Sequence, residues 1–267
     1  MTNTFSRQVL PTPEALRPWV TGIGSVSVGA GAGSAEPYVQ LPDTATTVVF
    51  RVGENGRRST LVVGPRTRAS YHHGKRFASC LEMRLAPGTT RPLLGVPAVD
   101  LVGRMVPLDE LAAAPARRLA RELRDLEPEE VVPHLARSFP DLSAAADRSR
   151  TALVTAGADA LSMRTGRVPG PVRDVARELA VSERQLRNLF AEGVGLSPKH
   201  YARINRVRAV LAQADDVPWA QLAATTGYYD QSHMTTDFRT LMGVPPRSFF
   251  TGRLPAARPC KAALAGR

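Results

Sequence analysis

Residues 171–190 read PVRDVARELAVSERQLRNLF, and this stretch decides the fold of the C-terminal part of the chain. Pro171 is suited to begin a helix, because the amide N–H that it lacks would be unbonded there. That helix ends before Ser182, which is a good N-cap for a second helix over residues 183–192. Apolar residues recur at helical spacing on the inner face of each helix: Val172, Val175, Ala176 and Leu179 on the first, and Leu186, Leu189 and Phe190 on the second. Two short helices joined by a tight turn predict a helix-turn-helix unit.

The outer face of the second helix carries Arg184, Arg187 and Asn188. Arginine can form paired hydrogen bonds with guanine, and asparagine with adenine, at the base edges exposed in the major groove. We therefore expect these three residues to read DNA bases. One helix-turn-helix pattern also arises by chance in helical proteins, so the prediction needs a second observation.

That observation is a repeat of the pattern 48 residues further along the chain. The matching pairs are Ser182 and Asp230, Leu186 and Met234, Phe190 and Phe238, Gly195 and Gly243, Pro198 and Pro246, and Tyr201 and Phe249. The second unit has a first helix over 219–226, a turn at Gly227 and a second helix from its cap Asp230 to Met242. Its outer face offers further base-reading candidates, namely Gln231, Ser232, Thr235 and Thr236.

A long helix between the two units is expected to begin at Ser197 and Pro198 and to end near Ala214. A helix of roughly 18 residues spans about 27 Å, and recognition helices in successive major grooves lie about 34 Å apart. A rigid connection of this length is compatible with two units on one face of DNA. The candidate phosphate contacts are Ser182, Lys199, Arg203, Arg239 and Arg247, with Arg206 and Arg208 near them on the connecting helix.

The net charge of the chain is +11 and its isoelectric point is about 10.7, which favours nucleic acid or another polyanion, or an anionic membrane surface. The plainer alternative is that the positive charge only reflects an arginine-rich composition and indicates no partner. Residues 151–267 carry a net charge of +7 and residues 1–150 one of +4, so the excess is concentrated in the part with the repeat. No apolar run approaches the roughly 18 residues of a membrane span, and no signal peptide is recognised. We expect a cytoplasmic protein without a membrane partner.

The first half of the chain has the pattern of an antiparallel sheet, either closed as a small barrel or paired as a sandwich. The expected strands cover 46–52, 59–63 and 79–85, with a turn at Asn55 and Gly56 between the first two. Residues 29–35, GAGAGSA, are expected to form a flexible loop.

Helices are expected to follow, the first from its cap Asp109 to about Leu126 and the second over 129–139, where Pro140 breaks it. The fold class is therefore α+β. Its expected parts are an N-terminal sensor or dimerisation domain over 1–146, a DNA-binding domain over 147–253 with two helix-turn-helix units joined by a long helix, and a disordered basic tail over 254–267.

The C-terminal part resembles the AraC/XylS family of bacterial transcription regulators over about 170–250. The most specific parts are 176–186 (ARELAVSERQL), Phe190, 195–199 (GLSPK), 227–233 (GYYDQSH), and Phe238 with Arg239. The resemblance implies two helix-turn-helix units in adjacent major grooves and an N-terminal domain that senses a small molecule or mediates dimerisation. Asn188 and Thr236 stand where the family often has arginine, and Ala180 stands where glycine is common. We therefore expect the first unit to dominate sequence specificity.

An enzyme is the main alternative class, and the histidine pair His72 and His73 is its best candidate feature. Adjacent residues of a strand point to opposite faces of a sheet, so the pair is not expected to act as one site. Cys80 and Cys260 provide neither a disulfide framework nor a zinc cluster. We expect no enzymatic activity, no metal and no cofactor.

The expected function is that of a sequence-specific regulator that binds double-stranded promoter DNA, works with RNA polymerase and is modulated by a small effector at the N-terminal domain. Two alternatives stay open. In one, the N-terminal domain only mediates dimerisation and takes no ligand; in the other, an enzyme-like N-terminal domain is fused to the DNA-binding module. A homodimer is compatible with each of these interpretations.

Overall fold

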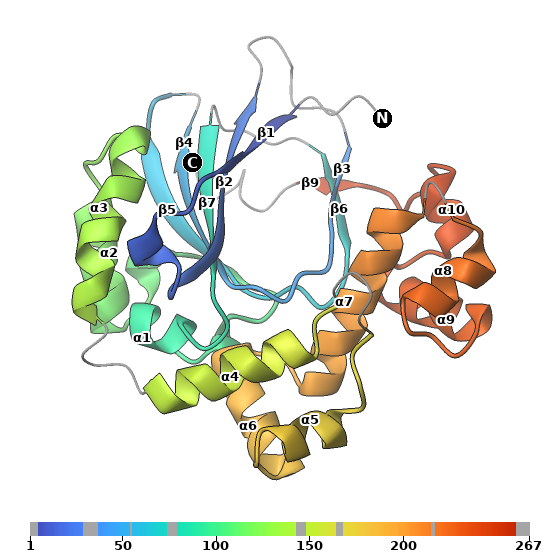
Figure 1. The fold of residues 1–267 in the computed structure, drawn as a ribbon. Coiled ribbons are helices and arrows are strands. Elements are labelled where there is room, and N and C mark those ends of the chain that lie inside the picture. Colours follow the sequence, from blue (N-terminus) through green and yellow to red (C-terminus); the bar gives the residue numbers. More distant parts are fainter. Residues whose placement is uncertain are drawn as a thin grey trace.

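The computed structural model describes residues 5–28, 37–53, 55–73, 79–142, 148–163, 168–214 and 217–259. An antiparallel β domain with its own helices precedes a helical region, which confirms the α+β class (Figure 1). The expected loop over 29–35 lies outside the described residues.

Six strands form the main sheet in the order β1-β2-β7-β4-β5-β8, and all neighbours are antiparallel. Their bounds are Phe5–Leu10 (β1), Val20–Val28 (β2), Thr47–Val52 (β4), Arg58–Val63 (β5), Ser79–Leu85 (β7) and Met105–Pro107 (β8). A smaller sheet has the order β3-β6-β9, formed by Tyr38–Gln40 (β3), Ser70–His73 (β6) and Arg258–Pro259 (β9). The expected turn joins β4 to β5, because Gly56 has a φ of +74° and Asn55 Oδ1 accepts a hydrogen bond from Arg57 N at 3.0 Å.

The core of the β domain forms where alternate side chains of the sheet meet two helices, α2 (Ala114–Leu123) and α3 (Pro128–Leu142). Phe50 of β4 and Met83 of β7 are buried there. The helices lie along the outer side of the sheet (Figure 1), and the ring of Phe139 meets that of Trp19 edge-on at 6.0 Å. Burying such apolar side chains stabilises a domain by about 1.5–3 kcal/mol each. Short elements complete the domain: α1 (Thr90–Leu94) and the 3-10 turns η1 (Glu14–Leu16), η2 (Ala98–Leu101) and η3 (Leu108–Glu110).

Two expected helix boundaries are wrong. Asp109 lies in η3 and caps no helix, and α2 begins at Ala114, where Pro115 occupies the first turn. Pro140 does not break α3, which continues to Leu142. A proline so close to the end of a helix removes one hydrogen bond from the final turns, a cost that the preceding packed turns of α3 can offset.

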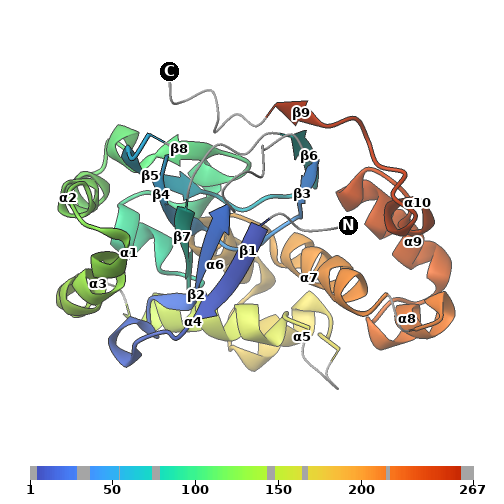
Figure 2. The same cartoon turned by 90° about the horizontal axis from the view of Figure 1, so that it is seen from above.

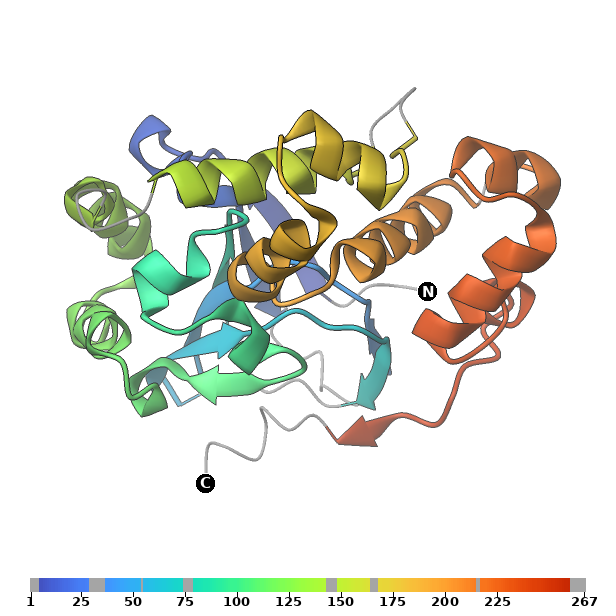
Figure 3. The same cartoon turned by 90° about the horizontal axis from the view of Figure 1, so that it is seen from below.

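The helical region has a second cluster of buried side chains, distinct from that of the β domain. Its helices are α4 (Arg148–Ala160), α5 (Val172–Glu178), α6 (Glu183–Gly193), α7 (Pro198–Gln213), α8 (Trp219–Thr225), α9 (Gln231–Met242) and α10 (Pro246–Phe250). Figure 3 shows α5 and α6 near one end of α7 and α8 to α10 near the other. The expected long helix is therefore present between the units, and Ser197 caps it by accepting a hydrogen bond from His200 N at 3.3 Å.

The expected disordered tail is wrong for its first part. Residues 254–259 return from α10 to the β domain, where β9 runs parallel to β6 and pairs His72 with Arg258 and His73 with Pro259 (Figure 2). One edge of β6 pairs with β3, and its other edge would have unpaired backbone groups without a further strand. The segment 254–259 supplies that strand, β9. Residues 260–267, including Cys260, lie outside the described residues.

Candidate nucleic-acid interface

The first helix-turn-helix unit consists of α5 and α6. Ser182 Oγ accepts a hydrogen bond from Gln185 N at 3.1 Å and so satisfies one amide at the start of α6. Leu186, Leu189 and Phe190 are buried against the neighbouring helices, as expected. The cap fixes where α6 begins, and the buried stripe fixes which face of α6 points outward.

That outward face carries the three base-reading candidates Arg184, Arg187 and Asn188, all of which are exposed. Arg187 Nη2 lies 4.0 Å from Glu183 Oε2, one helical turn earlier. An exposed pair of this kind is worth at most about 0.5 kcal/mol, so Arg187 can exchange Glu183 for another partner. The three candidates on the N-terminal half of α6 therefore present two cations and one amide to the solvent.

The second unit consists of α8 and α9, with Asp230 as the cap of α9. The carboxylate Oδ1 of Asp230 accepts a hydrogen bond from His233 N at 2.7 Å, while Met234 and Phe238 are buried. The candidates Gln231, Ser232 and Thr236 are exposed, and Thr235 is half-buried. Thr236 Oγ1 donates to the carbonyl oxygen of Ser232 at 2.9 Å, which leaves this hydroxyl only its acceptor lone pairs for an external partner.

The first helices and the second helices of the two units are separated by different numbers of residues. The first helices, 172–178 and 219–225, are 47 residues apart, whereas their second helices begin 48 residues apart, at Glu183 and Gln231. The turn of the second unit is therefore one residue longer. The offset of 48 seen in the sequence holds from the N-caps onward only.

The residue that turns the chain in each unit has a left-handed backbone conformation. In the first unit it is Ala180, with a φ of 52°, and in the second it is Gly227, with a φ of 75°. Alanine is unfavourable in this region because its Cβ crowds the following carbonyl group, and glycine is not. Ala180 thus stands where the resemblance places glycine, and it adopts the conformation that glycine favours.

Four of the five phosphate candidates are exposed: Ser182, Lys199, Arg239 and Arg247. Arg203 is less accessible to a phosphate, because its Nε lies 2.6 Å from Asp237 Oδ1 and its side chain is only 26% exposed. Arg206 Nη2 lies 3.6 Å from Asp237 Oδ2. Both arginines of α7 are thus held by a buried carboxylate of α9.

Asp237 is the centre of a polar cluster that fixes α9 against α7. The guanidinium of Arg206 also lies 5.0 Å from the ring centroid of Tyr228, and that ring meets His233 edge-on at 5.2 Å. Burial and the nearby charge of Asp237 raise the pKa of Tyr228, so the phenol stays protonated. The cluster sets the orientation of the second unit relative to the connecting helix.

A second buried carboxylate, Asp43, joins the β domain to α7. Its oxygens accept two hydrogen bonds from Arg84, from Nη1 at 2.5 Å and from Nη2 at 2.8 Å. Arg66 Nη2 lies 3.6 Å and Arg208 Nη1 3.7 Å from Asp43 Oδ2, and the same Arg208 atom donates to the carbonyl oxygen of Pro42 at 3.0 Å. Burial opposes the ionisation of Asp43, but Arg84 and Arg208 outweigh it and lower its pKa from 3.8 to about 2.

Arg208 therefore lies between the domains, although the sequence suggested a place near the phosphate contacts. The β domain also contacts the C-terminal ends of both second helices. Gly88 N donates to Gly193 O of α6 at 2.9 Å. Tyr71 Oη donates to Met242 O of α9 at 2.5 Å. These contacts leave the N-terminal halves of α6 and α9, with their base-reading candidates, outside the interdomain surface.

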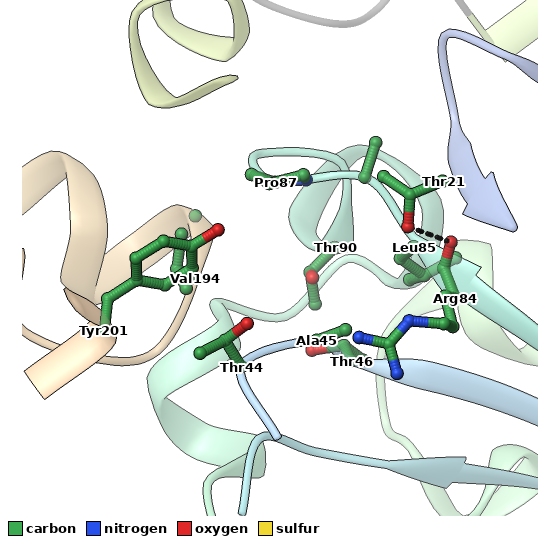
Figure 4. A pocket seen from close by; sticks show the side chains of 12 residues that line it. Thr21, Thr44, Ala45, Thr46, Arg84, Leu85, Pro87, Thr90, Val194 and Tyr201 are labelled. Atoms are coloured by element: carbon green, nitrogen blue, oxygen red, sulfur yellow. Dashed lines mark hydrogen bonds between the residues drawn. The ribbon is translucent and has the colours of Figure 1, made fainter. Parts of the chain in front are cut away.

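A cavity of about 90 Å³ lies between the domains (Figure 4). Its lining includes Thr44, Thr46 and Thr90 from the β domain and Tyr201 from α7. The side chains of these three threonines form no hydrogen bond within the described part of the chain, whereas Tyr201 Oη lies 3.1 Å from Ser162 Oγ. Figure 4 shows Tyr201 facing Thr90 and Thr44, with the guanidinium of Arg84 at the same opening. The cavity thus has unused hydroxyl groups and a wall from each domain.

The residues considered for an enzyme or metal site have different surroundings. His72 Nε2 lies 2.9 Å from Ser70 Oγ, His73 is exposed, and Cys80 is a buried free thiol. In the described ranges, no three histidine, cysteine, aspartate or glutamate side chains are grouped so that they could hold a metal ion. None of the helices described is both long and apolar enough to cross a membrane.

Comparisons with known proteins agree with the geometry of the helical region. Residues 175–252 match the family model of a helix-turn-helix domain. A solved structure from Chromobacterium violaceum, described as a transcriptional regulator of the group of proteins that contain an AraC-type DNA-binding domain, is 31% identical over 32% of this chain and 78% of its own, with a TM-score of 0.28.

Longer matches have much lower identity. ToxT from Vibrio cholerae O395 is 10% identical over 93% of this chain and 97% of its own, with a TM-score of 0.42. Wild-type ToxT from V. cholerae strain SCE256, solved with a bound unsaturated fatty acid, is 12% identical over 96% and 98%, with a TM-score of 0.39. No curated protein sequence matches the chain.

Proposed function

Because the chain belongs to the AraC-type family of helix-turn-helix transcription regulators, we propose that it reads two successive major-groove segments of promoter DNA with α6 and α9. The observation that carries the proposal is that both second helices expose a polar N-terminal half while their C-terminal ends are packed. Recognition helices contact bases with their N-terminal residues. The 16 residues of α7 span about 24 Å, which suits a rigid connection between neighbouring grooves.

We assign direct readout to the exposed candidates of the two helices and to the half-buried Thr235. Arg184 and Arg187 pair with guanine edges and Asn188 with an adenine edge. Gln231, Ser232, Thr235 and Thr236 make the contacts of the second unit, and Ser182, Lys199, Arg239 and Arg247 contact phosphates. Arg203 is removed from this set, since Asp237 holds its guanidinium. Such a regulator acts in the cytoplasm, with RNA polymerase as its protein partner.

Substituting Arg187 by alanine is expected to weaken binding to the selected operator about tenfold or more, because one bidentate pair with guanine is lost. Thr236→Ala is expected to cost less than about threefold, because the Thr236 hydroxyl already donates within its own helix. The operator is first selected from random DNA with the full chain, and the two dissociation constants are then measured by fluorescence anisotropy.

Arg121→Ala is the matched control, since Arg121 is an exposed arginine of α2 in the other domain. It removes the same charge and is expected to leave the affinity nearly unchanged. Equal losses for Arg187→Ala and Thr236→Ala contradict the dominance of the first unit. Affinity for the wild-type chain should fall steeply with salt, because phosphate contacts release counterions, and an affinity that does not respond to salt counts against DNA binding itself.

We further propose that a small effector occupies the interdomain cavity. Its three threonine hydroxyls, which have no hydrogen-bond partner among the described residues, favour a neutral molecule rich in hydroxyl or carbonyl groups, since the charge of Arg84 is already matched by Asp43. A ligand there contacts the β domain and α7 together, so its binding changes how firmly the two are joined.

The effector proposal is tested by denaturing the purified full chain and identifying released small molecules by mass spectrometry. A polar molecule is expected from the wild type and a much smaller amount from Thr90→Val, which removes one cavity hydroxyl at nearly constant volume. If the wild type releases nothing and polyols do not raise its melting temperature, the N-terminal domain serves dimerisation without a ligand.

A further inference from the structure

The longer turn of the second unit contains one residue without a counterpart in the first. In the first unit Ala180 N donates to Arg177 O and Val181 N to Ala176 O. In the second, Gly227 N donates to Ala224 O and Tyr228 N to Ala223 O. Ala180 therefore corresponds to Gly227 and Val181 to Tyr228, and the caps Ser182 and Asp230 correspond to each other. The additional residue is Tyr229.

Tyr229 is turned away from the protein. Its side chain is 94% exposed, whereas the neighbouring Tyr228 is 5% exposed and packs against Arg206 and His233. Burial of an aromatic ring stabilises the folded chain, and here it stabilises through the ring of Tyr228 but not through that of Tyr229. The ring of Tyr229 therefore contributes little to stability.

Tyr229 lies where α9 is proposed to enter the major groove of DNA. It directly precedes the cap of α9, and the N-terminal end of a recognition helix is the end that approaches the bases. Phosphates line both edges of that groove, and tyrosine is among the side chains that donate hydrogen bonds to them. The first two turns of α9 offer Gln231, Ser232, Thr235 and Thr236 but no arginine or lysine, and His233 is the one titratable donor among them, so a neutral donor beside the cap can supply a phosphate contact there.

We propose that Tyr229 is a DNA-backbone contact of the second unit, in which its phenol hydroxyl donates a hydrogen bond to a phosphate oxygen beside the groove entered by α9. This inference rests on the proposed function. The contact orients α9 on the duplex and carries no sequence information of its own. Because the phenol is neutral, the contact releases no counterion, and this separates it from the arginine and lysine contacts.

The test uses the full chain and the operator selected with it. Tyr229→Phe and Tyr229→Ala are both expected to weaken binding about five- to tenfold, with the same slope of log affinity against log salt as the wild type. Arg247→Ala is the contrasting variant, because loss of a charged phosphate contact reduces that slope by about one. Melting temperatures of both Tyr229 variants should equal that of the wild type, since the side chain is exposed.

Operators with single methylphosphonates along the second half-site locate the contact. One such substitution is expected to weaken wild-type binding and to leave Tyr229→Phe unaffected. Wild-type affinity in Tyr229→Phe overturns the proposal, and a loss in Tyr229→Ala alone would assign the ring to a base or sugar instead of the hydroxyl to a phosphate. If the wild-type chain selects no sequence at all, the proposed function has failed, and that result is visible before any variant is made.

Discussion

Substituting Asp43 by asparagine is expected to lower the free energy of unfolding by about 3 kcal/mol, because removal of one partner from a buried ion pair leaves the other uncompensated. Asp43 is buried beside three guanidiniums, from Arg66, Arg84 and Arg208. The last of these lies on α7, so the substitution weakens the junction between the β domain and the helical region as well as the β domain itself. Chemical denaturation at pH 7 measures the loss.

The contribution of Asp43 depends on pH in a direction fixed by its pKa. Folding lowers that pKa from 3.8 to about 2, so the stabilisation is fully present at neutral pH, begins to fall near the unfolded value and is lost as the pH approaches 2. The shift corresponds to about 2 kcal/mol at roughly 1.4 kcal/mol per pKa unit. The difference in stability between the wild type and Asp43→Asn should therefore shrink by about this amount between pH 7 and pH 2.

Asp109→Asn is the control for this series, because Asp109 is an exposed carboxylate of the same domain with no capping role. It should change stability by less than about 0.5 kcal/mol. A gap between wild type and Asp43→Asn that stays constant over the acid range would show that the carboxylate of Asp43 is not held ionised by its arginines.

Asp237→Asn is expected to be about as costly, near 3 kcal/mol, and to weaken operator binding as well. The substitution removes the common partner of Arg203 and Arg206, two cations of α7 whose side chains are only 26% and 23% exposed. Without it, α9 is no longer fixed against α7 and the second unit loses its orientation. Amide hydrogen exchange across α9 should then become faster than across α6.

The matched control is Glu178→Gln, which neutralises an exposed carboxylate of α5 in the first unit. It should leave both stability and exchange rates nearly unchanged. Exchange in α6 that rises as much as in α9 would mean that Asp237 supports the helical region as a whole and does not orient the second unit.

The helix-turn-helix units could be predicted from the sequence because their determinants are local. A cap lies within three residues of the amide that it binds, as Ser182 and Asp230 do, and the buried stripe of a helix repeats every three or four residues. The exposed candidates on α6 and α9 follow from the same periodicity, because the face opposite a buried stripe points outward.

Boundaries that depend on packing were not predictable in this way. Asp109 has the chemistry of a helix cap but lies in a 3-10 turn, and Pro140 continues a helix that a proline ordinarily ends. The segment 254–259 has the composition of a disordered tail and pairs with β6 because the fold leaves an edge of that strand open. In each of these cases the deciding partner or packing surface is distant in the chain.

The sequence alone determined that two capped, amphipathic helix pairs are present and which of their side chains face outward. Only the tertiary structure decided which cations remain available to DNA. Arg203 and Arg206 are bound by Asp237, about 30 residues later in the chain, and Arg208 by Pro42 and Asp43, which are 166 and 165 residues earlier. The sequence shows which residues are arginines, but not which of them lies beside a carboxylate that neutralises its charge. That carboxylate comes near only when the chain folds. A buried carboxylate is tolerated only where a cation beside it offsets the cost of its burial.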